Sequence, residues 1–91
     1  KVWEVDLHIE QLVDKYRNLS NYEIVQIQIR HCEFTIEKAM KNNVMKLIVI
    51  HGKGEGVLKE EVRQLLKKYS VEVKDADYRI YGFGATEVQF Y

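Results

Sequence analysis

Proline is absent from the chain, and cysteine occurs only once, at Cys32. A single thiol excludes an internal disulfide framework and fits a reducing compartment, so we expect a cytoplasmic protein. Long apolar runs are also missing. The longest is residues 47–50, far short of the roughly 20 residues that span a bilayer. We therefore expect no membrane partner.

Neither sign of charge is in excess, because 14 Lys and Arg balance 14 Asp and Glu. No global field draws the chain toward nucleic acid, membranes or acidic partners. Between residues 45 and 69, however, the chain has six basic residues and only three acidic ones. A solvated helix face with lysines near its C-terminal end accounts for most of this excess.

The remaining composition is that of an ordinary soluble domain, with 46% hydrophobic and 31% charged residues among 91. It excludes collagen-like, low-complexity and intrinsically disordered classes. The length fits one folding unit. Because the chain begins at Lys1, we expect residues 1–91 to form a single domain of a longer protein.

The hydrophobic pattern predicts alternating strands and helices. Residues 2–7 alternate as a half-buried strand, and helical spacing follows over residues 9–16. Residues 22–43 are rich in β-branched residues but too long for a strand, so we predict a helix. A buried strand over 45–50 and an amphipathic helix over 57–69 come next. Residues 71–73 are extended, and 78–81 and 86–90 read as paired strands around Gly82–Phe83–Gly84.

The order β-α-β-α-β-β predicts an α/β two-layer sandwich, in which two main helices pack on one face of a mixed four-stranded sheet. A strand–helix–strand unit closes as a right-handed parallel crossover, so the first two strands should be parallel neighbours.

A glycine loop between the buried strand and the second main helix is the most informative local feature. Glycines stand at alternating positions, Gly52, Gly54 and Gly56, with His51 and Lys53 beside them. Backbone amides of such a loop, together with a helix N-terminus, can form an anion site. The spacing matches neither a Walker loop nor a dinucleotide fingerprint. Alternatively, the glycines only make a tight turn.

Polar side chains also end the first strand. Asp6 and His8 would share one face, and parallel strands would bring His51 to the same sheet edge. These side chains with Lys53 could support general acid–base chemistry on a phosphodiester. An ordinary polar strand end is the alternative. A divalent metal stays open as a cofactor, but no closely spaced Cys/His set exists, and Cys32 falls on a presumed core face.

Aromatic residues add a further candidate surface. Trp3, Tyr81, Phe83 and Tyr91 could stack on nucleic-acid bases, although sheet aromatics are more often core or cross-strand pairs. Phe83 lies between two glycines, so it is the one of these four that we most expect to be exposed, and it is the best candidate for contact with a partner. His31 is expected on the outer or flanking face of the long helix.

The chain resembles the Smr (small MutS-related) domain family in three motifs. Val5-Asp6-Leu7-His8 is similar to the family's "LDLH" opening. Residues 47–59 are similar to its strand, HGKGxG loop and helix start. Gly84-Ala85-Thr86-Glu87-Val88 is similar to its "GATxVxL" strand. The resemblance covers nearly the whole chain and implies a fold similar to the C-terminal domain of bacterial initiation factor three. Two departures are Ile9, where the family usually has glycine, and additional residues from 10 to 22.

The resemblance implies binding of DNA or RNA and, in several members, DNA nicking or RNA cleavage, with or without a metal. Carried over, Asp6 and His8 match the first motif and His51 the second, as candidate catalytic residues. The candidate phosphate-binding residues are Gly52, Lys53, Gly54, Gly56 and Lys59. The alternative is a non-catalytic module that binds a protein partner through the long helix 22–43 or the aromatic turn and keeps a vestigial phosphate loop. A small-anion or phosphometabolite binder would rest on the loop alone.

Overall fold

The computed structural model describes all 91 residues, arranged as a four-stranded sheet with its main helices on one face. The strands are β1 (Val2–Asp6), β2 (Lys46–Ile50), β3 (Val71–Asp75) and β4 (Ala85–Phe90). The helices are α1 (Ile9–Leu12), α2 (Asn21–Lys41), α3 (Val57–Leu66) and α4 (Tyr78–Tyr81). The predicted α/β sandwich with a mixed sheet is therefore confirmed.

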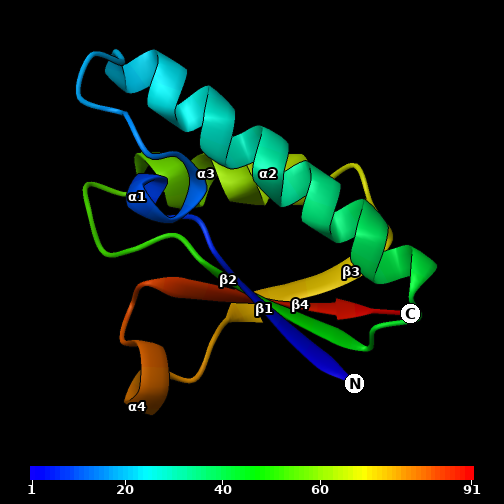
Figure 1. The fold of residues 1–91 in the computed structure, drawn as a ribbon. Helices are drawn as coiled ribbons and strands as arrows, with labels where there is room; N and C mark the ends of the chain where they lie inside the picture. Colours follow the sequence, from blue (N-terminus) through cyan, green and yellow to red (C-terminus); the bar gives the residue numbers. More distant parts are fainter.

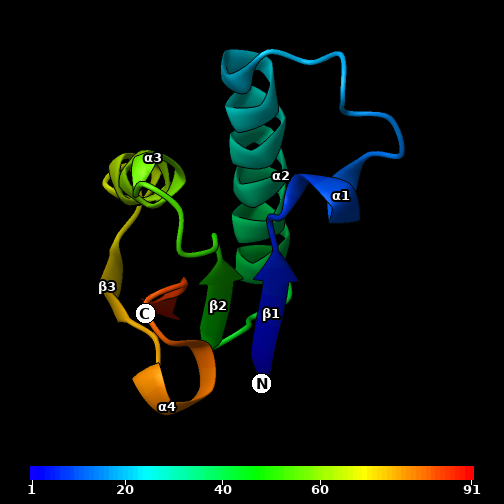
Figure 2. The same cartoon turned by 90° about the vertical axis from the view of Figure 1, so that its left-hand side faces the viewer.

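The sheet order is β1-β2-β4-β3, with β1 and β2 parallel and the other pairs antiparallel. The predicted parallel crossover is confirmed. Figure 2 shows β1 and β2 side by side and pointing the same way, so the segments that follow them leave the sheet at one edge. This arrangement brings the first motif and the glycine loop together.

The long helix α2 forms despite its strand-like composition because its start is well capped. The Ser20 side chain accepts a hydrogen bond from the Glu23 amide at 3.1 Å, and the Glu23 carboxylate accepts one from the Ser20 amide at 2.8 Å. This capping box satisfies two donors of the first turn. Cys32, Ile36 and Ala39 then lie fully buried on the face toward the sheet, while His31 is exposed as expected.

Two apolar clusters hold the layers together. The larger lies between the sheet and α2 and α3 and includes Leu7, Leu47, Val49 and Val88. The smaller lies where α4 covers the opposite side of the sheet and consists of Ile48, Ala76 and Ala85, with Ile50 and Tyr81 packed against it. Burial raises the pKa of the Cys32 thiol to about 12, which leaves it a neutral part of the core. No helix has the length and apolarity that crossing a membrane requires.

Two predicted elements are wrong: the strand over residues 78–81 and the length of the helix over residues 9–16. Tyr78–Tyr81 is the short helix α4, and the strand that pairs with β4 is β3, Val71–Asp75. The Asp77 side chain accepts a hydrogen bond from the Arg79 amide at 2.9 Å, so a helix cap overrides the alternating pattern. The helix predicted over residues 9–16 ends at Leu12, where the backbone becomes extended at Val13.

Candidate nucleic-acid site

His8 and Asp6 form a hydrogen-bonded pair directly after β1. The Asp6 carboxylate oxygen Oδ1 accepts hydrogen bonds from the His8 ring Nδ1 at 2.6 Å and from the His8 amide at 2.9 Å. Partial burial opposes ionisation of Asp6, but the two His8 hydrogen bonds and its charge outweigh burial and lower the carboxyl pKa. Because an ionised carboxylate can only accept, Asp6 fixes the His8 ring with the proton on Nδ1 and leaves Nε2 without a hydrogen-bond partner.

The free Nε2 of His8 lies against the glycine loop. A Cβ built on Gly52 would stand only 2.9 Å from this atom, and Gly52 has a φ of +85°. Both facts require glycine here, since a side chain would be strained and would displace the imidazole. No hydrogen bond engages His8 Nε2 within the protein, and the His8 side chain is 46% exposed.

His51, in contrast, is buried, with 7% of its surface exposed. Its Nδ1 lies 3.0 Å from the Gly52 carbonyl oxygen and its Nε2 lies 3.0 Å from Thr86 Oγ1. Because a carbonyl can only accept, Nδ1 carries the proton and Nε2 accepts from the Thr86 hydroxyl, which in turn accepts from Arg63 Nε at 3.3 Å. Both ring nitrogens are used, so the geometry favours His51 as a residue that positions the loop.

Burial lowers the pKa of His51. The neighbouring cations Lys59 and Arg63 act in the same direction, whereas the hydrogen bond to Gly52 and the charge of Asp75 oppose them. A neutral ring is what this hydrogen-bond chain needs, because a protonated Nε2 could no longer accept from Thr86.

The loop presents a row of unpaired amides. The amides of His51 and Gly52 both donate to the Gly84 carbonyl at 2.9 Å, which ties the loop to the turn before β4. The Gly52 amide is therefore not available for a phosphate. The amides that follow donate to no group in the protein, up to the first turn of α3: Lys53, Gly54, Glu55, Gly56, Val57 and Leu58. All of these residues except Lys53 border a groove of about 280 Å³ that reaches the start of α2.

The two candidate lysines differ in their partners. Lys53 is exposed and forms no ion pair. Lys59 lies 3.3 Å from Asp75, which also binds Arg63 at 2.8 Å. Lys53 is thus the unneutralised cation of the loop, and Lys59 is partly engaged.

Three further residues shape the site. Gln28 is buried on α2, and its Nε2 donates to the Leu7 carbonyl at 2.9 Å, which holds the backbone between Asp6 and His8. Thr86 and Gly84 fix His51 and the loop. Thr86 and Gly84 belong to a motif visible in the sequence, whereas Gln28 carries no such signal. The structure holds no group of three or more His, Cys, Asp or Glu side chains placed to bind a metal ion.

Comparison with known proteins identifies the family and agrees with the fold. The family model for the Smr domain matches residues 28–91, and the chain therefore belongs to the Smr domain family. Among solved structures it is similar to the Smr domain of Thermus thermophilus MutS2, with a TM-score of 0.73 and 28% identity. The match covers 97% of this chain and 96% of that chain, so the two domains have nearly the same extent. The comparison with curated proteins found no match.

Proposed function

We propose that this Smr domain binds a nucleic-acid strand by one backbone phosphate at the loop 53–58. Unpaired amides at the start of a helix attract an anion, and Lys53 adds a positive charge without an internal counterion. Membership of the Smr family supports a nucleic-acid phosphate as that anion.

We further propose that His8 acts as a general base when the strand is cut: its Nε2 takes the proton of the attacking hydroxyl group or water as the bond from phosphorus to the leaving oxygen breaks. The observation that carries this proposal is the free Nε2 of His8, which faces the loop while Asp6 holds Nδ1. A carboxylate that orients one ring nitrogen and stabilises the imidazolium is a known way to prepare a general acid or base. In this scheme Asp6 is a positioning residue, and His51 acts only through the loop.

The test compares binding with cleavage. His8→Gln should keep affinity for a short oligonucleotide within about threefold and lower the cleavage rate by about 100-fold or more. Lys53→Ala should instead weaken binding. Lys41→Ala, which changes an exposed lysine at the end of α2, is the control and should alter neither.

Cleavage by the His8→Gln variant at the wild-type rate would contradict the role of His8. If Lys53→Ala binds as tightly as Lys41→Ala, the phosphate does not lie at this loop.

A further inference from the structure

An aromatic pair lies exposed beside the glycine loop. Tyr78 at the start of α4 and Phe83 in the following turn have 61% and 66% of their surfaces exposed. Their ring centroids are 4.7 Å apart and the planes are tilted by 58°. The core clusters include neither ring. The two rings together form a small apolar surface with no partner inside the domain.

Lys53 packs against the turn that carries this pair. A Cβ on Gly82 would lie 3.2 Å from Lys53 Cε and 3.6 Å from Nζ, so the lysine stem passes directly over Gly82. Gly82 has a backbone φ of +60°, which residues other than glycine rarely adopt. The ammonium group of the loop therefore reaches the residue next to Phe83, although loop and turn are far apart in the sequence.

We propose that the Tyr78–Phe83 pair stacks on an unpaired base of a single strand whose phosphate is bound by Lys53 and the loop amides. The inference rests on the proposed function and specifies its substrate: a single strand, or a duplex with an unpaired base. Aromatic faces beside a cation are the usual means of binding single strands, because every base offers a flat face for stacking. A base inside a duplex is already stacked and cannot reach the pair.

Charge favours a base on this surface over an apolar protein segment. Lys53 has no counterion in the domain, and the cationic Arg79 is 87% exposed on α4, where it pairs only with Asp77 at 3.1 Å. A nucleic-acid strand supplies both an aromatic face and a phosphate at neighbouring positions.

The test measures fluorescence anisotropy with labelled probes of three kinds: a short oligothymidylate, a fully paired blunt-ended duplex of similar length, and the oligothymidylate with its bases removed. Wild type should bind the single strand more tightly than the duplex. Phe83→Ala should weaken binding of the base-containing strand about 5- to 100-fold, Phe83→Trp should preserve it, and neither should change binding of the abasic strand.

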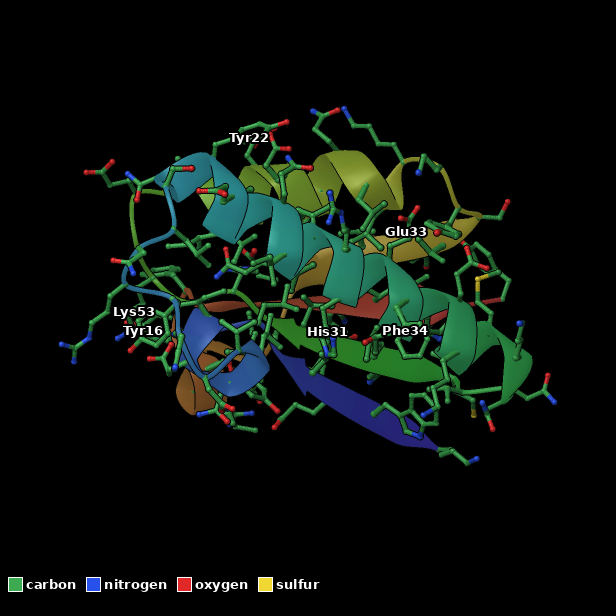
Figure 3. The ribbon with its side chains drawn as sticks, turned by 45° about the horizontal axis from the view of Figure 1, so that its top comes forward. Tyr16, Tyr22, His31, Glu33, Phe34 and Lys53 are labelled. Carbon is green, nitrogen blue, oxygen red and sulfur yellow. The ribbon has the colours of Figure 1, made fainter.

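Phe34→Ala is the matched control. Phe34 is 63% exposed on α2, and Figure 3 places it well along that helix, away from Lys53. This variant should bind all three probes as wild type does. Because Phe34 and Phe83 are both largely exposed, both variants should fold.

The outcomes separate the inference from the proposed function. If Lys53→Ala weakens binding but Phe83→Ala does not, the stacking surface is refuted and the phosphate site stands. Equal losses for Phe83→Ala on base-containing and abasic strands would also refute stacking. If wild type binds none of the probes, both proposals fail, and the pair becomes a candidate protein contact.

Discussion

Gly52 links the two halves of the site at the scale of a single residue. Its carbonyl accepts from His51, its amide donates to Gly84, and its Cα side faces His8 Nε2. The HGKG motif therefore needs this glycine for two separate reasons: the positive φ and the close approach of the imidazole.

Gly52→Ala should lower the free energy of unfolding by about 1–3 kcal/mol, because alanine is strained at a φ of +85° and its Cβ would stand 2.9 Å from His8 Nε2. Chemical denaturation measures the change. Gly54→Ala is the matched control, since Gly54 has no positive φ and no neighbour within 4 Å of a built Cβ. It should stay within about 0.5 kcal/mol of wild type. Equal effects of the two substitutions would contradict the close approach.

His51 predicts a dependence of stability on pH. Burial lowers its folded-state pKa below 6.5, so at mildly acidic pH the unfolded chain binds a proton that the folded domain excludes. The stability that neutral His51 contributes is complete above pH 6.5 and is lost as the pH falls below that value. Denaturation curves from pH 7.5 downward should show this loss in wild type and a smaller loss in His51→Gln.

The exposed His31 provides the control for that measurement. His31→Gln should lose stability with falling pH as wild type does. A His51→Gln variant with the same pH dependence as wild type would mean that the folded domain protonates His51 as readily as the unfolded chain does.

At the scale of the element, the sequence predicts those parts of the fold whose pattern and caps agree. Residues 45–50 and 57–69 have an apolar strand and an amphipathic stripe, and β2 and α3 lie there with shifted ends. Residues 78–81 alternate like a strand, but one side-chain cap at Asp77 makes them helical. The sheet then closes through residues 71–75, which the sequence marks only as extended.

The same reasoning applies to the site. The motifs locate Asp6, His8 and the loop, because parallel strands end at one edge of a sheet. They do not separate the exposed His8 from the buried His51, since only packing against Thr86 and Arg63 decides which imidazole is free. They also miss Gln28, because one buried side-chain hydrogen bond across 21 positions leaves no periodic signal.

Gln28 connects α2 to the backbone that carries His8. Gln28→Leu should lower the free energy of unfolding by about 1–3 kcal/mol, because the buried Leu7 carbonyl loses its partner. Chemical denaturation should show the lower free energy of unfolding, and the amide NMR signal of His8 should shift. Gln26→Leu on the same helix removes no hydrogen bond, so it should leave the His8 signal in place. An undisturbed His8 signal in Gln28→Leu would show that α2 does not position the site.

For the whole molecule, the balance of charge limits how strongly the domain can hold a nucleic acid. Lysines and arginines equal the acids in number, and several of them are paired internally, among them Lys59, Arg63, Lys68 and Arg79. Of the cations on the glycine loop, at the start of α3 and on α4, only Lys53 has no internal ion pair, so few counterions can be displaced from a strand bound there. The domain therefore suits a local contact at one position of a strand rather than a long electrostatic track.

This view predicts a shallow salt dependence. A plot of log affinity against log salt for a single strand should have a slope of about −0.7 to −1.4, which corresponds to one or two phosphates. Lys53→Ala should bring that slope closer to zero by about 0.7, whereas Lys59→Ala should change it less, because Asp75 already neutralises Lys59 in part. Anisotropy titrations at several salt concentrations give the slopes. A wild-type slope steeper than about −4 would require a basic surface that spans several phosphates, and the paired cations of this domain do not supply one.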